Sequence, residues 1–349
     1  MLVLVLGYYG FGNFGDELIL TAVQSELAEI DTQAIFVVND PGQYASTQSS
    51  RSMFVDRRDL AGIRRAIHDC DYVMLGGGGL IQDATSLRSS LYYLGIPLLA
   101  SLQRKGIISY AQGVGPIRRP FIQRLTRLVF GRMALIDVRD EASAYTLRSC
   151  GVRKREIHIS CDVGFSLLMA QRQVHSNVSC TRPRIVAAVN ARFGWTAEET
   201  ASFLDCLASQ YAAQITLVVL FPSMDSSFSR AVRDRLLTTS EVIDSPTAQE
   251  LVDVCSSSTL IIAGRYHMAA AAVAARSPVV GLAYDAKIAQ LAASFKFLSV
   301  HRGDSPQRAA ALILQSPAAI ADEGALDHLV EARSDRIGRL RKLLEQRPA

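Results

Sequence analysis

Two side chains in the second half of the chain have the types and spacing of an anion-binding site. Arg265 and His267 follow the apolar run 260–263. The alanine-rich stretch after them predicts a helix over Met268 to Ala275, so both stand at a helix N-terminus, where backbone N–H groups can bind an anion. An arginine there offers a two-pronged fork to a carboxylate or phosphate, and a histidine can give and take protons near neutral pH. The alternative for His267 is a purely structural role.

A lysine stands in a similar place further along. Lys287 follows an expected strand over Pro278 to Leu282, and Asp285 is expected to cap the next helix. A lysine in the first turn of a helix opposes the helix dipole, and a bound anion explains its position there. Because neighbouring parallel strands end at one edge of a sheet, we expect Lys287 to lie near Arg265 and His267.

Arg139 is a further candidate for holding an anion. It stands in Val138-Arg-Asp-Glu141, where an expected strand ends and an expected helix begins. Asp140 and Glu141 suit the start of a helix, but neither capping nor the dipole explains the arginine. The alternative is an arginine that pairs with its acidic neighbours.

The first glycine-rich segment runs from Gly7 to Glu17. Its glycines from Gly10 onward match the spacing G-x-G-x-x-G, and Asn39-Asp40 closes the next apolar run, where a ribose-binding acid would stand. One interpretation of this pattern is therefore a nicotinamide-dependent dehydrogenase. However, Asp16 and Glu17 would repel a pyrophosphate at the helix N-terminus. The segment better suits a neutral ligand rich in hydroxyls, with Asp16 as hydrogen-bond acceptor or base. The alternative for Asp16 is a helix N-cap.

The second glycine-rich segment, Gly76 to Gly79, directly follows an apolar run. Four successive glycines lower local stability, so such a run indicates that a ligand comes close to the backbone. Gln82 and Asp83 would then offer side-chain partners to that ligand. The alternative is a flexible turn with a polar exit.

Composition excludes several classes of protein. The 349 residues are 49% hydrophobic and 20% charged, with a formal charge of +4, which does not favour a nucleic-acid-binding protein. No apolar run approaches the length of a membrane span, and the opening Met1 to Leu6 is too short for a signal sequence, so we expect a cytoplasmic protein. The six cysteines are far apart and indicate neither a disulfide framework nor a zinc site.

Short apolar runs alternate with helix-length segments, which is typical of parallel α/β layers. The polar, aperiodic stretch 170–183 resembles a linker between two such series. The fold class expected is therefore α/β, with two Rossmann-like domains facing a central cleft. The predicted divisions are an N-terminal domain over 1–170, a C-terminal domain over 184–316 and a helical tail over 317–349.

The tail carries many arginines. A basic amphipathic helix can lie on an anionic membrane surface, which leaves peripheral contact with the inner membrane face open. The alternative is a terminal helix with a solvated basic face that packs through Ile337, Leu340 and Leu343.

Six motifs taken in order resemble the polysaccharide pyruvyl transferase family of bacteria, the kind that anchors proteins to the cell surface. They cover roughly residues 1 to 300 and are Gly7–Glu17, Gly76–Asp83, Gln112-Gly-Val-Gly-Pro116, Val138–Glu141, Gly264-Arg-Tyr-His267 and Tyr284-Asp-Ala-Lys287. Positions 266 and 286 and the stretch 221–227 depart from the family pattern, and the last of these puts the identity of the acceptor sugar in doubt.

The resemblance implies a fold of the two-domain glycosyltransferase type, called GT-B, and the transfer of pyruvate from phosphoenolpyruvate to two hydroxyls of a sugar. It implies no cofactor, no metal and no nucleic acid; the partners are phosphoenolpyruvate and a sugar acceptor, free or lipid-linked. The donor would be bound by Arg139, Arg265 and Lys287. His267 and Asp16 would be catalytic. The acceptor would meet the glycine segments, through Asn13, Gly78, Gly79, Gln82 and Asp83.

Three other functions are weighed against this one. A glycosyltransferase that uses a nucleotide sugar could hold a diphosphate with Arg265 and Lys287 and would ignore phosphoenolpyruvate. A sugar-binding module without a reaction is disfavoured by the cationic side chains at the strand ends. A dehydrogenase ranks last.

Overall fold

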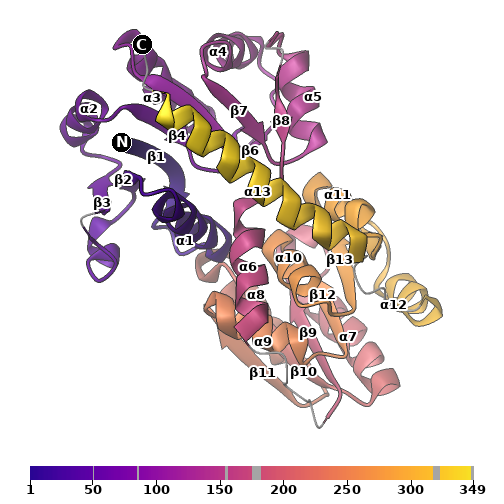
Figure 1. Cartoon of the computed structure of the whole chain (residues 1–349). Coiled ribbons are helices and arrows are strands. Elements are labelled where there is room, and N and C mark those ends of the chain that lie inside the picture. The colour runs from indigo at the N-terminus through magenta and orange to yellow at the C-terminus, as the bar shows by residue number, and fades with distance from the viewer. Residues whose placement is uncertain (50, 85, 154–155, 175–181, 317–322, 347–349) are drawn as a thin grey trace. The chain divides into compact units, whose positions relative to one another are not determined.

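The computed structural model describes the 349-residue chain except for residues 50, 85, 154–155, 175–181, 317–322 and 347–349 (Figure 1). The chain divides into two compact units. The first unit contains 1–11, 16–163 and 329–349, and the second contains 12–15 and 164–328. Each unit is built around one parallel sheet, so the expected α/β fold class is confirmed.

The first unit has strands in the order β3-β2-β1-β4-β6-β7-β8, and β5 adds to β6. The first six follow the Rossmann order, in which the chain starts at the centre and winds outward in both directions. The side chains of the central strands β1, β4, β6 and β7 are nearly all buried, as parallel strands covered on both faces require. The bounds are β1 Leu2–Tyr9, β2 Gln33–Val38, β3 Ser52–Asp56, β4 Tyr72–Leu75, β5 Gly78–Ile81, β6 Gly106–Val114, β7 Leu135–Val138 and β8 His158–Ile159.

The helices of the first unit connect these strands, and several begin at a side chain that accepts a hydrogen bond from the first turn. Asp59, Ser86 and Asp140 act in this way for α2, α3 and α5. The bounds are α1 Phe14–Glu29, η1 Pro41–Tyr44, α2 Leu60–Asp69, α3 Leu87–Leu102, α4 Pro120–Phe130 and α5 Glu141–Ser149.

The second unit repeats the same topology, with strand order β11-β10-β9-β12-β13-β14. Two of its helices, α7 and α9, begin with a capping box, Thr196 with Glu199 and Thr247 with Glu250. The strands are β9 Arg184–Ala188, β10 Gln214–Val219, β11 Ser240–Asp244, β12 Leu260–Ala263, β13 Val279–Ala283 and β14 Leu298–His301. The helices are α6 Val163–Val174, η2 Ala191–Phe193, α7 Ala197–Tyr211, α8 Pro222–Arg233, α9 Ala248–Ser256, α10 Tyr266–Ala274, α11 Ala286–Phe295 and α12 Pro306–Gln315.

The predicted linker needs correction. Residues 170–174 continue helix α6, whose apolar side chains Phe165 and Leu168 are buried. The rest of the expected linker lies largely outside the described residues. Three strands had no counterpart in the sequence analysis: β3, β5 and β11. The strands β3 and β11 lie at sheet edges and are only partly buried, so they lack the continuous apolar run of a central strand.

The C-terminal helix α13, Glu323–Glu345, packs through apolar side chains as expected, and also through two of its arginines, which the prediction of a solvated basic face did not foresee. The side chain of Arg336 is fully buried and pairs with Glu26 of α1 at 2.7 Å. Arg339 pairs with the buried Asp137 at 2.8 Å. Ile337 and Leu340 are buried as expected. Leu326 and Leu344 are buried as well, whereas Leu343 is only partly buried.

The cysteines in the described part of the chain, Cys70, Cys150, Cys161, Cys206 and Cys255, are all free thiols. Cys180 lies outside that part. Among the described helices, none is both long and apolar enough to cross a membrane.

Candidate active site

The turn that carries Arg265 is unusually tight. A side chain at Gly264 would place its Cβ 2.5 Å from the carbonyl oxygen of Ala188, so only glycine fits there. The amide of Asn190 also donates a hydrogen bond to the Gly264 carbonyl. The turn joins strand β12 to helix α10, and Arg265 occupies the N-cap position of that helix. The predicted placement of Arg265 and His267 at a helix N-terminus is confirmed.

Arg265 forms a two-pronged ion pair with Asp225, in the first turn of α8. Its Nε donates to Oδ2 of Asp225 at 2.8 Å, and its Nη2 donates to Oδ1. Both side chains are largely buried. Burial alone would lower the pKa of Arg265, but the hydrogen bonds and charge of Asp225 outweigh it and raise that pKa. The pair fixes the plane of the guanidinium and leaves little net charge.

Asp225 was not predicted as a site residue. It lies in the stretch 221–227, which departs from the family pattern and was expected to be a loop. Pro222 at the first turn of α8 was an available signal for a helix start. The partner of Asp225 lies 40 positions away in sequence, so no local pattern reveals the pair.

His267 lies in the first turn of α10, against a glycine from the other end of the sequence. A Cβ added to Gly15 would meet Nδ1 of the His267 ring at 2.0 Å and Cε1 at 2.3 Å. The segment 12–15 belongs to the second unit, and the N–H of Phe14 donates to the Leu220 carbonyl at 2.9 Å. Gly15 is therefore needed for contact with the imidazole, a role that the dinucleotide-loop spacing did not suggest.

Lys287 lies in the first turn of α11, which follows β13. Asp285 caps this helix as predicted, and its Oδ1 accepts from the Lys287 backbone N–H at 3.0 Å. Because β12 and β13 are neighbours in register, the segments after them, with Arg265 and Lys287, leave the same edge of the sheet. Tyr284, between them in sequence, is close enough to Arg265 to raise its pKa.

Arg139 belongs to the first unit, and its side chain is only 8% exposed. Its Nε donates to Oδ2 of Asp140 at 3.0 Å, and its Nη1 lies 3.6 Å from Oδ2 of the buried Asp162. The structure therefore confirms the alternative interpretation, in which Arg139 pairs with acidic neighbours. Asp162 was not anticipated, since it comes from beyond the edge strand β8.

Gly113, on β6, lies between the second glycine segment and Arg139. A Cβ at Gly113 would lie 2.8 Å from the Gly78 carbonyl oxygen and 2.9 Å from Nη2 of Arg139. A Cβ at Gly78 would lie 3.4 Å from Oδ1 of Asp16. Within the first unit, Gly78 thus has Asp16 as one neighbour and Gly113 as another, and Gly113 in turn lies against Arg139.

Asp16 and the second glycine segment differ from expectation. Helix α1 begins at Phe14, so Asp16 lies inside its first turn, and the N-cap alternative is wrong. Asn13 instead precedes the helix, and its Oδ1 accepts from the Gly15 N–H at 3.4 Å. Gly78 and Gly79 were expected in a loop but form the start of strand β5, held by a hydrogen bond from Nε2 of Gln112 to the Gly78 carbonyl at 2.7 Å.

Gln82 and Asp83 have structural partners. Both oxygens of the buried Asp83 carboxylate accept backbone N–H groups, from Arg118 at 2.9 and 3.0 Å and from Arg119 at 2.7 Å. Oε1 of Gln82 accepts from the Ala84 N–H at 2.9 Å. Asp83 therefore organises the start of α4.

An aromatic cluster at the carboxyl end of β1 was missed. The rings of Tyr8 and Phe11 stack at 4.0 Å, and the guanidinium of Arg57 lies 5.1 Å from the ring centres of both Phe11 and Tyr92. Such half-buried rings suit the apolar face of a sugar, and the arginine suits an anionic substituent. Arg57 follows the edge strand β3, which was not predicted, and so no pattern in the sequence pointed to this arginine.

The fold and the polar strand ends define an enzyme class. Solved structures similar to this chain include two UDP-GlcNAc 2-epimerases and a protein in complex with UDP-glucose. The UDP-GlcNAc 2-epimerase of Methanocaldococcus jannaschii aligns over 96% of this chain and 99% of its own, with TM-score 0.62 and 13% identity. The Neisseria meningitidis UDP-GlcNAc 2-epimerase, bound to UDP-GlcNAc, aligns over 98% and 100%, with TM-score 0.64 and 14% identity. Anabaena HepE in complex with UDP-glucose aligns over 97% and 99%, with TM-score 0.61 and 13% identity.

At such low identities these similarities show the fold alone, which is that of the GT-B enzymes. The chain belongs to the polysaccharide pyruvyl transferase family, whose sequence profile matches residues 13–286. The family resemblance is thereby confirmed. No curated protein sequence matches the chain.

Proposed function

We propose that the protein transfers pyruvate from phosphoenolpyruvate to two hydroxyls of a sugar in a cell-surface polysaccharide or its lipid-linked precursor. The products are a cyclic ketal and inorganic phosphate. The observation that carries the proposal is the grouping of Arg265, His267 and Lys287 after neighbouring strands of the second unit, in a chain that belongs to the pyruvyl transferase family.

The donor is held by charge. Arg265 is directed by Asp225 and supplies a fork for the carboxylate or phosphate of the donor. Since the Arg265–Asp225 pair is nearly neutral, the positive charge for an anionic donor must come largely from Lys287 and the N-terminal N–H groups of α10. Arg139, neutralised in the same way by Asp140 and Asp162, gives directional hydrogen bonds rather than net charge.

His267 moves the protons of the reaction. It donates a proton to the methylene carbon of phosphoenolpyruvate, which becomes a methyl group, and the positive charge develops at C2. A sugar hydroxyl attacks C2 and loses its proton. The C2–O bond to phosphate then breaks, and a second hydroxyl attacks C2 and loses its proton in turn. One proton is consumed at the methyl group and the other leaves with phosphate, so His267 is regenerated.

The acceptor sugar is assigned to the two glycine-rich segments. Asp16, next to Gly78, is placed to accept a hydrogen bond or proton from a sugar hydroxyl, and the glycines allow the sugar to approach the backbone. Asn13 offers an amide at the start of α1, and Gly79 adds open backbone. Gln82 and Asp83 shape the segment through their backbone contacts.

A glycosyltransferase that uses a nucleotide sugar remains the second candidate. The observation in its favour is that the neighbours in fold include structures with UDP-GlcNAc and UDP-glucose bound. The two functions differ in their donor, and so a binding measurement with phosphoenolpyruvate and with UDP-glucose separates them.

The decisive experiment measures phosphate release from phosphoenolpyruvate in the presence of a panel of pyrophosphate-linked and lipid-linked sugars. We expect release only with a subset of acceptors, and none from the His267→Gln variant with an unchanged circular dichroism spectrum. Release at the wild-type rate from His267→Gln would refute the role of His267. Turnover of a UDP-sugar without use of phosphoenolpyruvate would refute the function.

A further inference from the structure

Helix α4 carries apolar side chains on its exposed side. Phe121 is 60% exposed and Leu128 is 43% exposed. With Leu125 they line a hollow of about 590 Å³, shared with arginines of the same helix and the turn after it. We call this the α4 surface, and it consists of Phe121, Arg124, Leu125, Arg127, Leu128, Gly131 and Arg132.

The α4 surface lies beside the face by which the helix packs, and the partly buried Leu125 also contacts the core. Ile122, Thr126 and Val129 point into the core of the first unit and are fully buried. They have the spacing i, i+4, i+7 of one helix stripe. Phe121, Leu125 and Leu128 have the same spacing and form a second stripe. The helix therefore has more apolar surface than its packing in this chain uses.

The stretch of sequence that contains α4 carries charge of one sign. The sequence has no aspartate or glutamate between Asp83 and Asp137, although the whole chain has 33 of them. The same stretch has eight basic residues: Arg88, Arg104, Lys105, Arg118, Arg119, Arg124, Arg127 and Arg132. Within the described residues, the five arginines from Arg118 to Arg132 make no ion pair with a carboxylate.

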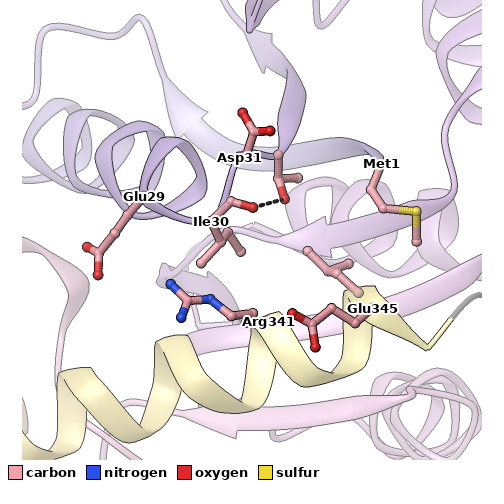
Figure 2. Close-up of a pocket in the computed structure, with 8 residues that line it drawn as sticks. Met1, Glu29, Ile30, Asp31, Arg341 and Glu345 are labelled. Carbon is pink, nitrogen blue, oxygen red and sulfur yellow. Dashed lines mark hydrogen bonds between the residues drawn. The ribbon is translucent and has the colours of Figure 1, made fainter.

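The C-terminal helix α13 is less suited than α4 to bind an anionic surface, although it has many basic residues. Arg336 and Arg339 pair with buried carboxylates of the first unit, and Arg333 pairs with Glu29 at 2.6 Å. Figure 2 shows Arg341 in a pocket of about 330 Å³ that is also lined by acidic side chains. These acidic residues are Glu29, Asp31 and Glu345.

We propose that the α4 surface docks the protein onto an anionic lipid bilayer. Exposed aromatic and aliphatic side chains enter the boundary between headgroups and acyl chains, while the surrounding arginines bind lipid phosphates. The absence of acidic residues across this whole stretch of sequence argues for a continuous negative surface as the partner. The exposure of Phe121 and Leu128 argues against binding by charge alone.

The α4 surface adjoins the glycine segment through Asp83, whose carboxylate holds the backbone of Arg118 and Arg119 at the start of the helix. A bilayer bound at α4 would thus lie next to the region assigned to the acceptor sugar. This connection rests on the proposed function, whereas the docking itself rests on the residues of α4 alone and is tested without any reaction.

The test is sedimentation of the 349-residue chain with two kinds of vesicle. One kind is pure phosphatidylcholine, and in the other about 30% of the lipid is the anionic phosphatidylglycerol. We expect binding to the anionic vesicles that weakens with added salt, and little binding to pure phosphatidylcholine. Arg124→Gln with Arg132→Gln should lower the partition coefficient about thirty-fold, since each arginine near the surface contributes on the order of 1 kcal/mol. Phe121→Ser with Leu128→Ser should lower it about tenfold or more.

Two control variants separate this surface from general effects. Arg341→Gln with Lys342→Gln removes two exposed charges of α13, and Leu237→Ser removes a leucine that is 94% exposed in the second unit. Both should bind vesicles like the wild type. The proposal is overturned if wild-type protein ignores anionic vesicles, if the α13 variant loses binding as strongly as the α4 variants, or if the α4 variants change only the oligomeric state. Loss of phosphate release with vesicle binding intact would count against the proposed function and leave the docking surface standing.

Discussion

The imidazole of His267 lies directly against Gly15, so close that a Cβ there would sit 2.0 Å from Nδ1. The two residues are far apart in sequence but belong to the same compact unit. A glycine near the N-terminus therefore limits where the ring of a proposed catalytic histidine can lie.

Replacing Gly15 by alanine should displace that ring. We expect the Gly15→Ala variant to fold, with a loss of about 1–3 kcal/mol in the free energy of unfolding from overpacking, and to lose most of its phosphate release from phosphoenolpyruvate. Gly95→Ala is the matched control, because Gly95 lies in helix α3 with no atom within 4 Å of an added Cβ. Full activity of Gly15→Ala would show that the ring position is unimportant.

Asp225 should act as a positioning residue for Arg265. Asp225→Ala leaves a largely buried guanidinium without its carboxylate, and we expect the free energy of unfolding to fall by about 3–5 kcal/mol. The double variant Asp225→Leu with Arg265→Met should regain much of that stability without regaining activity. Urea unfolding followed by circular dichroism, together with a phosphate-release assay, measures both effects.

The surface pair Arg233–Asp234 at the end of the same helix provides the control. Asp234→Ala should change stability by less than about 1 kcal/mol, as exposed pairs do. Equal losses of unfolding free energy for Asp225→Ala and Asp234→Ala would show that the buried Arg265–Asp225 pair contributes no more than a surface pair.

The buried pair between Arg336 and Glu26 should hold the C-terminal helix on the first unit. Arg336→Ala should destabilise the protein by about 3–5 kcal/mol, because Glu26 would remain buried with less compensation. Arg341→Ala, at an exposed position of the same helix, should cost little. Denaturant unfolding curves of the two variants compare them, and similar midpoints would show that Arg336 adds nothing.

Asp140 should make stability depend on pH in the acid range. Burial alone would raise the pKa of Asp140, but the charge of Arg139 and hydrogen bonds from Ser143 outweigh it and hold that pKa below its usual value. A carboxylate with a lowered pKa in the folded state stabilises the protein above its unfolded pKa of about 3.9, and this contribution disappears as the pH falls through the folded pKa. The wild type should therefore be more stable than Asp140→Asn at neutral pH, and the two curves should converge in acid. A constant difference at every pH would exclude the charge effect.

The sequence predicted most central strands and the helices between them, because buried parallel strands read as continuous apolar runs. It missed β3 and β11 for the same reason, since edge strands such as Ser240–Asp244 are half polar. Helices without a strong capping signal, such as α6, were also missed.

The candidate site was predictable in its residue types and in its place at strand ends, but not in its contacts. Arg265 and His267 stand at the helix N-terminus that the alanine-rich segment predicted. The carboxylates that pair with the arginines, Asp225 and Asp162, come from distant segments, and no periodicity links such residues. Gly15 matched a spacing typical of dinucleotide loops, yet its contact is with His267.

The pairing of Glu26 with Arg336, 310 positions apart, has a consequence for synthesis. At about 5–20 residues per second, a ribosome would need on the order of 15–60 s to deliver the arginine after it has delivered the glutamate. During that interval the nascent chain carries an acid that its finished fold encloses. A chain released before α13 is made would keep that acid uncovered, so the burial of this charge has to wait for α13.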